Sequence, residues 1–313
     1  MTELKYEIRP QKFPSLLDGT FRILRSRFLV FLLMSLVFMG ISRFLLDLTT
    51  RLTSSTALSM QGNITSDLLE GIMLIISLLV VTLTYYLLSP PFMAAVSGIT
   101  MNHLKGKATS FRDALKIAGK TAVPVIVTQF LVGLLISLSF ILPALIFFIP
   151  GLTIGITGDS GWIIVLFFIF IFFCLTALFL FLFISVRFYL VVPVIIQEGI
   201  GYVDALKRSW HLTRSFFWRI LGLWFMTGLL TYSYQFVINV SSQLSIATDF
   251  PIAVNGLVSL VFTPLYVIPE SLIPILSTLI YVDSRCRKEG WDLESKMDHW
   301  EEARNKASAE RWS

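Results

Sequence analysis

Charged residues are scarce in this chain of 313 residues. Asp, Glu, Lys and Arg make up 14% of it, where a soluble globular domain has roughly 25%. Cysteine is scarcer still, with two residues in the chain. This is too few for a small secreted fold held together by disulfides. Apolar residues account for 55%, and the mean hydropathy is +0.78. This balance excludes a disordered or collagen-like chain and predicts an all-α integral membrane protein.

Six stretches with few or no charges are long enough to cross a bilayer, whose ~30 Å apolar core needs about 20 helical residues. The fourth stretch is followed by Arg187, beyond which the helix can continue to residue 196, and the sixth contains Glu270. Six transmembrane helices are therefore predicted. Their ranges are 28–42 extended by 44–46, 71–102, 121–158, 160–186, 220–248 and 252–282.

The basic residues are concentrated in four segments. Six Lys and Arg residues lie in 1–27, five in 105–120, four in 207–219 and seven in 285–311. Because short basic loops stay on the cytoplasmic side, both termini are predicted to be cytoplasmic, with the N-terminus retained as a signal anchor. The pI of about 9.2 follows from this topology, and nucleic acid is not expected as a partner.

A short motif recurs before each predicted span that leads away from the basic side. Ser15-Leu16-Leu17-Asp18, Ser110-Phe111-Arg112-Asp113 and Gly201-Tyr202-Val203-Asp204 share one pattern, and their first residues are 95 and 91 positions apart. Ser or Gly can cap a helix, and the Asp places negative charge on its first turn. Apolar residues then follow at helical spacing with basic residues opposite, which predicts an amphipathic helix in the headgroup plane.

Three copies of one unit therefore account for the chain, each an amphipathic helix followed by two spans. The predicted repeats occupy 1–104, 105–198 and 199–284, and a helical cytoplasmic tail occupies 285–313. Prolines in the even spans predict bends, which either shape the bundle or line a cavity as in transporters. These prolines are Pro90, Pro91, Pro193, Pro264, Pro269 and Pro274.

Residues near both ends of the chain carry a family resemblance. Arg9-Pro10, Ser15 to Asp18 and Phe21 to Arg25 resemble the opening of the bacterial glycerophosphoryl diester phosphodiesterase membrane-domain family. The segment from Leu279 to Leu293, with Tyr281, Asp283, Arg285 and Glu289-Gly290, resembles its closing pattern. The middle of the chain is similar through Arg187-Phe188, Pro193, Glu198, Asp204 to Leu206 and Ser209-Trp210. The resemblance covers nearly the whole chain and implies a polytopic membrane fold, with this chain a stand-alone member lacking the catalytic domain that some members carry.

Two charges inside predicted spans are candidate site residues. Arg187 lies about 16 Å before Glu198, and Glu270 about 20 Å before Asp283, at ~1.5 Å per helical residue. An unpaired charge at mid-bilayer costs roughly 2.5 to 3.5 kcal/mol. We therefore expect Arg187 and Glu270 to pair across the fourth and sixth spans, either to fix register or as a polar patch in a substrate or proton path.

The tail has an apolar helical face formed by Trp291, Leu293, Met297 and Trp300. It is interpreted either as an edge lying on the membrane or as a docking helix for another subunit, because Trp is enriched at both kinds of interface.

Catalytic patterns are missing from the sequence. His103, His211 and His299 lie in separate segments without Cys or carboxylate at ligand spacing, and neither cysteine belongs to a Cys-x-x-Cys motif. No phosphate-binding or dinucleotide loop is present, so neither an enzyme nor a cofactor is expected. The sequence favours a noncatalytic scaffold or accessory subunit of a bacterial inner-membrane assembly. The partners expected are the lipid bilayer and another protein or further copies of the chain. The alternative is a carrier or channel for a lipid-like or amphipathic solute.

Overall fold

A computed structural model describes residues 10–42, 44–45, 64–157, 163–247, 267–294 and 297. Within these ranges the regular elements are all helical, in agreement with the all-α prediction. Five helices gather into what we call the head: α1 (Phe13–Ser26), α2 (Phe28–Ser35), α7 (Val191–Glu198), α8 (Tyr202–Thr213) and α11 (Leu272–Glu289).

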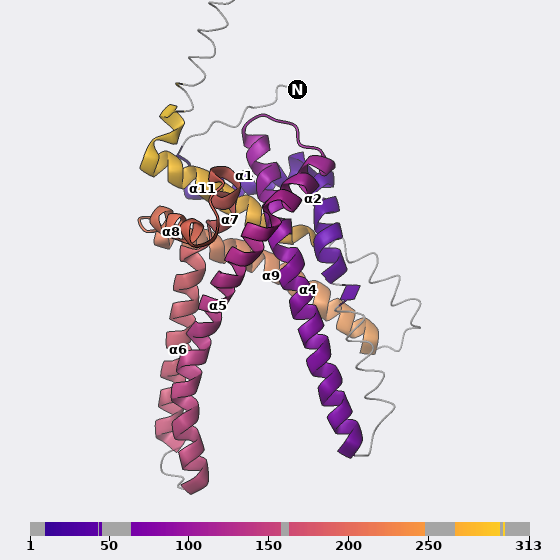
Figure 1. Cartoon of the computed structure of the whole chain (residues 1–313), viewed down its shortest axis with the longest axis vertical. Coiled ribbons are helices and arrows are strands. Elements are labelled where there is room, and N and C mark those ends of the chain that lie inside the picture. The colour runs from indigo at the N-terminus through magenta and orange to yellow at the C-terminus, as the bar shows by residue number, and fades with distance from the viewer. Residues whose placement is uncertain are drawn as a thin grey trace, which may run out of the picture.

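Three long helices run out from the head, as Figure 1 shows. They are α4 (Ile64–Leu104), α5 (Phe111–Thr157) and α6 (Ile163–Arg187). Helices α5 and α6 pack along each other, whereas α4 contacts α5 near the head and then diverges from it (Figure 1). Helix α9 (Phe217–Ala247) also begins at the head, and two short turns, η1 (Leu36–Gly40) and η3 (Ile268–Ser271), follow α2 and precede α11.

Three described helices are long and apolar enough to cross a membrane: Gly71–Leu104, Phe111–Ile141 and Phe167–Glu198. A fourth candidate is the pair Phe13–Ser26 and Phe28–Gly40, whose axes meet at 86°. The chain is therefore helical with three or four candidate spans in its described part. The fifth predicted stretch is helical as α9, and the sixth includes the first part of α11, while residues 248–266 lie outside the described ranges.

The predicted helix starts agree with the structure in the second and third repeats but not in the first. In the second repeat, the Ser110 backbone N–H donates to Asp113 Oδ2 at 3.1 Å, as a capping side chain does. In the third, Gly201 precedes the first residue of α8. The first prediction is wrong by three residues, because the N-cap is Lys12 rather than Ser15, and α1 begins at Phe13 with Pro14 in its first turn, where proline is favoured.

Two of the three amphipathic segments are separated from the following helix by a break in the helix, and one is not. Helix α1 turns sharply into α2 at Arg27, and α8 ends three residues before α9. In the second repeat, however, the basic segment is the first part of the continuous helix α5. The prediction of a distinct amphipathic helix is thus wrong for that repeat, because nothing in residues 111–121 interrupts the helical backbone.

The prolines also act differently from one helix to the next. Helix α4 continues through Pro90 and Pro91, so these prolines do not end the helix. Pro193 and Pro274 each stand in the first turn of a helix, α7 and α11 respectively. In that position a missing backbone N–H removes no hydrogen bond. Between α6 and α7 the chain forms a turn at residues 188–190.

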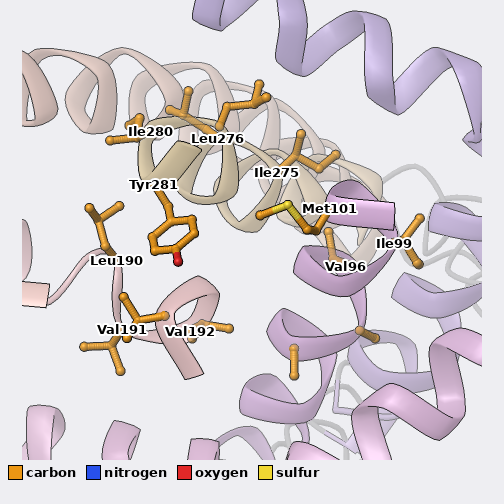
Figure 2. Close-up of a cluster of buried hydrophobic side chains, with 14 of the residues drawn as sticks. Val96, Ile99, Met101, Leu190, Val191, Val192, Ile275, Leu276, Ile280 and Tyr281 are labelled. Carbon is orange, nitrogen blue, oxygen red and sulfur yellow. The ribbon is translucent and has the colours of Figure 1, made fainter. Parts of the chain in front are cut away.

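The core lies inside the head, where α4, α7 and α11 converge. Figure 2 shows Val96, Ile99 and Met101 of α4 beside Ile275 and Leu276 of α11, with the Tyr281 ring directed toward α7. Tyr281 is fully buried. Helices α4 and α5, which contact each other, also carry small buried residues, and such residues permit close approach of helices in a membrane. These residues are Ala94, Ala95, Ala114 and Ala118.

Gly98 marks the tightest part of the contact between α4 and α5. A Cβ at this position would lie 2.8 Å from Ile117 Cγ2. We expect Gly98→Leu to separate the two helices and to lower the free energy of unfolding by about 1 to 3 kcal/mol. The measurement is the thermal midpoint of the purified protein in mild detergent. Gly119→Leu is the matched control, because nothing lies within 4 Å of its Cβ position. Equal midpoints for the two variants would contradict the close packing.

Candidate functional site

Arg187, the last residue of α6, lies among three aromatic rings. Its guanidinium carbon is 4.9 Å from the ring centroid of Phe183, 4.7 Å from that of Trp210 and 5.6 Å from that of Phe217. We call these three rings, from α6, α8 and α9, the aromatic cage. The rings also contact one another, with Phe183 5.6 Å from Trp210 and 5.8 Å from Phe217. Cation–π attraction therefore holds the charge where the ends of three helices meet.

The backbone of Arg187 is fixed as firmly as its side chain. Ser209 Oγ donates to its carbonyl oxygen at 2.8 Å, and Thr213 Oγ1 donates to the same oxygen at 3.4 Å. Its guanidinium is different, because within the described part of the chain the buried Nε and Nη1 atoms have no hydrogen-bond partner. An arginine offers five N–H donors. The cage therefore positions a cation whose Nε and Nη1 donors are not used by the described part of the chain.

Glu270 has a different neighbour. It lies in η3, which packs against α2 and α9, and its Oε1 accepts a hydrogen bond from Gln235 Nε2 at 2.6 Å. Next to it, the Ser271 and Ser35 hydroxyls are 2.8 Å apart, which joins η3 to α2. This arrangement supplies the carboxylate with an amide donor from α9.

The predicted pairing of Arg187 with Glu270 is therefore corrected. Among the described residues no ion pair joins them, and each has the partners given above. The prediction matched their depths along two straight helices. In the structure α6 ends at Arg187 beside α8 and α9, and the chain turns before α7, whereas η3 places Glu270 against α2 and α9.

A ring of charges ties α7, α8 and α11 together. Glu198 accepts from Arg208 Nε at 2.8 Å and from the Tyr281 hydroxyl at 3.0 Å. Arg208 Nη2 is 2.6 Å from Glu289 Oε1, and Arg285 Nε donates to Glu289 Oε2 at 2.9 Å. Arg285 Nη1 also reaches the Tyr281 hydroxyl at 3.4 Å, which closes the ring. Both carboxylates are thus held by arginines.

These contacts set the ionisation of Glu289. Partial burial alone would raise the pKa of this carboxyl, but the hydrogen bonds and charges of Arg285 and Arg208 outweigh it and lower the pKa. Glu289 therefore stays ionised at neutral pH, and its contribution to stability is lost only as the pH falls through the lowered value.

A second charged group joins the two ends of the described chain. Asp283 of α11 is buried and accepts a hydrogen bond from the Gln11 backbone N–H at 2.7 Å. Its Oδ2 is 2.8 Å from Arg219 Nη1 and 3.1 Å from Arg287 Nε. Both arginines also donate to the Gln11 carbonyl oxygen. The segment before α1 is thus held to α9 and α11 through one carboxylate.

The tail residues predicted as a docking face do not share one environment. The Trp291 ring packs edge to face with Tyr281, with the centroids 6.5 Å apart, and Arg285 lies over it at 4.6 Å. Leu293 and Met297 are exposed, by 63% and 65%. Trp300 lies outside the described residues. Trp291 therefore belongs to the head, and the exposed part of the face is formed by Leu293 and Met297.

The histidines and cysteines do not converge. His103 Nε2 is 3.5 Å from Ser26 Oγ, His211 is exposed, and His299 lies outside the described residues. Cys174 is exposed on α6, while burial raises the pKa of the Cys286 thiol to about 11. In the ranges that the structure describes, no three His, Cys, Asp or Glu side chains come together as a metal site.

The residues that carry the family resemblance meet in the head. Tyr281 of the closing pattern donates to Glu198 from the middle of the chain, and Glu289 of the same pattern pairs with Arg208 of α8. Asp283 of the pattern pairs with Arg219 of α9. Sequence reasoning named these residues but assigned no role to them, although the alternating charges from Asp283 to Glu289 were a signal for ion pairs on one helix. Comparison of the chain with protein-family profiles, curated proteins and solved structures gives no match. Function is therefore inferred from the contacts above.

Asp283 is the natural residue on which to test the charged head. Asp283→Asn keeps the shape but leaves Arg219 and Arg287 without a countercharge, so we expect a loss of about 3 to 5 kcal/mol in the free energy of unfolding. Protease cleavage near Gln11 should become faster, and the thermal midpoint in detergent should fall. The control is Asp204→Asn, whose carboxylate is 77% exposed and 3.7 Å from Lys207. We expect a change of at most ~1 kcal/mol there. Similar losses in both variants would contradict the central role of Asp283.

Proposed function

We propose that this chain is a noncatalytic polytopic protein of a bacterial cytoplasmic membrane that serves as a scaffold or accessory subunit of a larger assembly. The basic segments around α1, α8 and the start of α5 all lie at the head (Figure 1). Since basic segments remain on the cytoplasmic side, this arrangement supports a cytoplasmic head and cytoplasmic termini.

Six crossings in three repeats remain part of this proposal. Helix α9 is 31 residues long, which is about 46 Å at ~1.5 Å per residue and enough to cross the apolar core. Helix α11 begins after η3, and residues 252–282 supply the apolar length of the sixth crossing. Support for the repeats comes from the three motif positions, each of which lies at or within two residues of a helix start.

The observation that carries the proposal is the exposure of α4 beyond the head. Many large apolar side chains between residues 72 and 87 are exposed, among them Ile75 at 63%, Leu79 at 61% and Leu83 at 66%. This exposed apolar surface of α4 is suited to contact with another membrane protein. We infer that α4 packs against a helix of a partner, and that Leu293 and Met297 form a second contact on the cytoplasmic side.

The resemblance to the glycerophosphoryl diester phosphodiesterase membrane-domain family agrees with this role. Three residues that carry the resemblance, Glu198, Asp283 and Glu289, belong to the ion-pair network of the head, where each is paired with an arginine. Carboxylates engaged in this way are suited to holding helices together rather than to general acid or base chemistry. We propose that the chain belongs to that family as a member whose membrane part has an assembly role.

Photocrosslinking in cells tests the scaffold. Benzoylphenylalanine placed at position 79 of α4 should give an adduct larger than the chain by the mass of a partner protein. The control position is Lys116, which is exposed on α5 close to the head. There the same probe should give no such adduct. If position 79 yields the chain alone or only lipid adducts, and the protein purifies as a monomer in mild detergent, the scaffold role is contradicted.

A carrier or channel for a lipid-like or amphipathic solute is the second candidate. It is favoured by Arg187, whose unused donors lie where the fourth predicted span is interrupted before α7. Liposomes containing the purified protein should then transfer a labelled amphipathic anion faster than empty liposomes, and Arg187→Gln should reduce the rate. Equal rates with and without the protein would contradict transport.

A further inference from the structure

Arg187 is one of three cations that lie near one another where α6, α8, α9 and α11 meet. All three lie around the end of α8. Arg187 is beside Trp210, and its carbonyl accepts from Thr213. Arg214 follows Thr213, and Lys288, near the end of α11, donates a hydrogen bond to the backbone carbonyl of His211. Burial, and after it the charge of Arg214, lower the pKa of Lys288, in agreement with this arrangement.

No carboxylate of the described residues forms an ion pair with these three cations. Glu289 acts on Lys288 but is held by Arg208 and Arg285 at 2.6 and 2.9 Å. Three cations kept together without a counterion repel one another, so the cluster is stabilised by an anion that can approach all three.

The guanidinium of Arg187 is held in a fixed position where it can bind an anion. The aromatic cage and the bonds from Ser209 and Thr213 fix its position. Its buried Nε and Nη1 atoms have no partner in the described part of the chain, and Nη2 is not among the buried unpartnered atoms. An oxyanion that reaches this guanidinium would bind a group whose orientation is already set, which reduces the entropy lost on binding.

An apolar stripe on α6 leads directly to this cation. Phe168, Phe172, Leu175 and Phe179 are spaced by four, three and four residues, so they share one helix face, and they are 64%, 73%, 60% and 65% exposed. Phe183 continues the stripe, with its ring 6.3 Å from that of Phe179, and Arg187 follows one turn later.

The dimensions of the stripe fit a membrane lipid. From Leu175 to Arg187 the helix rises about 18 Å, slightly more than half of the ~30 Å apolar core and thus about one leaflet. Trp218, at the start of α9, is 80% exposed, as is common for Trp at the level of the lipid headgroups. A cation cluster at headgroup level and the part of the stripe between Leu175 and Phe183 match the two parts of a phospholipid.

We propose that Arg187, Arg214 and Lys288 bind the phosphate of an anionic membrane phospholipid, whose acyl chain lies along the part of the stripe from Phe183 to Leu175. The proposal depends on the membrane location of the chain but not on a scaffold or carrier role. The net negative charge of the lipid distinguishes it from a zwitterionic one, because the site supplies three positive charges. The acyl chain distinguishes it from free phosphate.

The test uses the purified full-length protein in a neutral detergent, and the readout is the thermal midpoint after addition of lipid. Phosphatidylglycerol should raise the midpoint by on the order of 3 to 5 °C, since a ligand that binds the folded state stabilises it. Phosphatidylcholine and 10 mM inorganic phosphate should each raise it by less than about a third of that amount. Salt at 0.5 M should reduce the effect of phosphatidylglycerol.

The variant Arg214→Gln with Lys288→Gln removes two of the cations without altering the aromatic cage. We expect it to lose most of the shift produced by phosphatidylglycerol while its midpoint without lipid stays close to that of the parent. The matched control is Lys207→Gln with Lys116→Gln, which removes the same charge from exposed positions outside the cluster, and it should keep the full shift.

Two outcomes would overturn the proposal. A full shift in the variant that lacks Arg214 and Lys288 would show that the lipid binds elsewhere. An equal shift with inorganic phosphate alone would show that the cluster takes a free anion and that the stripe on α6 has no part in binding. Neither result depends on a protein partner, so failure of this proposal can be told apart from failure of the scaffold role.

Discussion

The buried carboxylate of Asp283 is the constraint on which the head depends. It lies in the last described helix and accepts the backbone N–H of Gln11 near the other end of the chain, while Arg219 and Arg287 balance its charge. A buried charge is tolerated only when its partners are close and correctly oriented. The start of the chain, α9 and α11 must therefore come together in one arrangement, and this fixes the place of α1 beside α11.

The need for such contacts follows from the membrane environment. Lipid tails are as apolar as leucine, so burial of apolar side chains does little to hold transmembrane helices together. In this chain the joining interactions are ion pairs at the head, such as Glu198 with Arg208, and close packing of small residues between α4 and α5, where Gly98 meets Ile117. Beyond these contacts many apolar side chains of α4 are exposed, which suits contact with lipid or with another membrane protein.

Polar residues near the membrane segments are held in two ways, some by hydrogen bonds and Arg187 by aromatic rings. Glu270 is joined to Gln235 by a hydrogen bond, and Glu198 is shared by Arg208 and Tyr281. Arg187 has rings instead of acceptors, with Arg214 and Lys288 nearby. Cation–π contacts position a charge without neutralising it. Glu270 and Glu198 therefore hold helices together, whereas Arg187 keeps a charge that is available to an anion.

The sequence by itself determined that the chain is helical, that long apolar segments such as the fourth predicted stretch form helices, and that helices start close to Ser110 and Gly201. These features depend on composition, spacing and capping, which act within a few residues. Only the tertiary structure decided that Glu270 meets Gln235, that Arg187 meets Trp210, and that Asp283 meets Gln11. Those partners are distant in the chain, and their approach depends on the turn before α7 and the sharp bend at Arg27, whose angles no local pattern specifies.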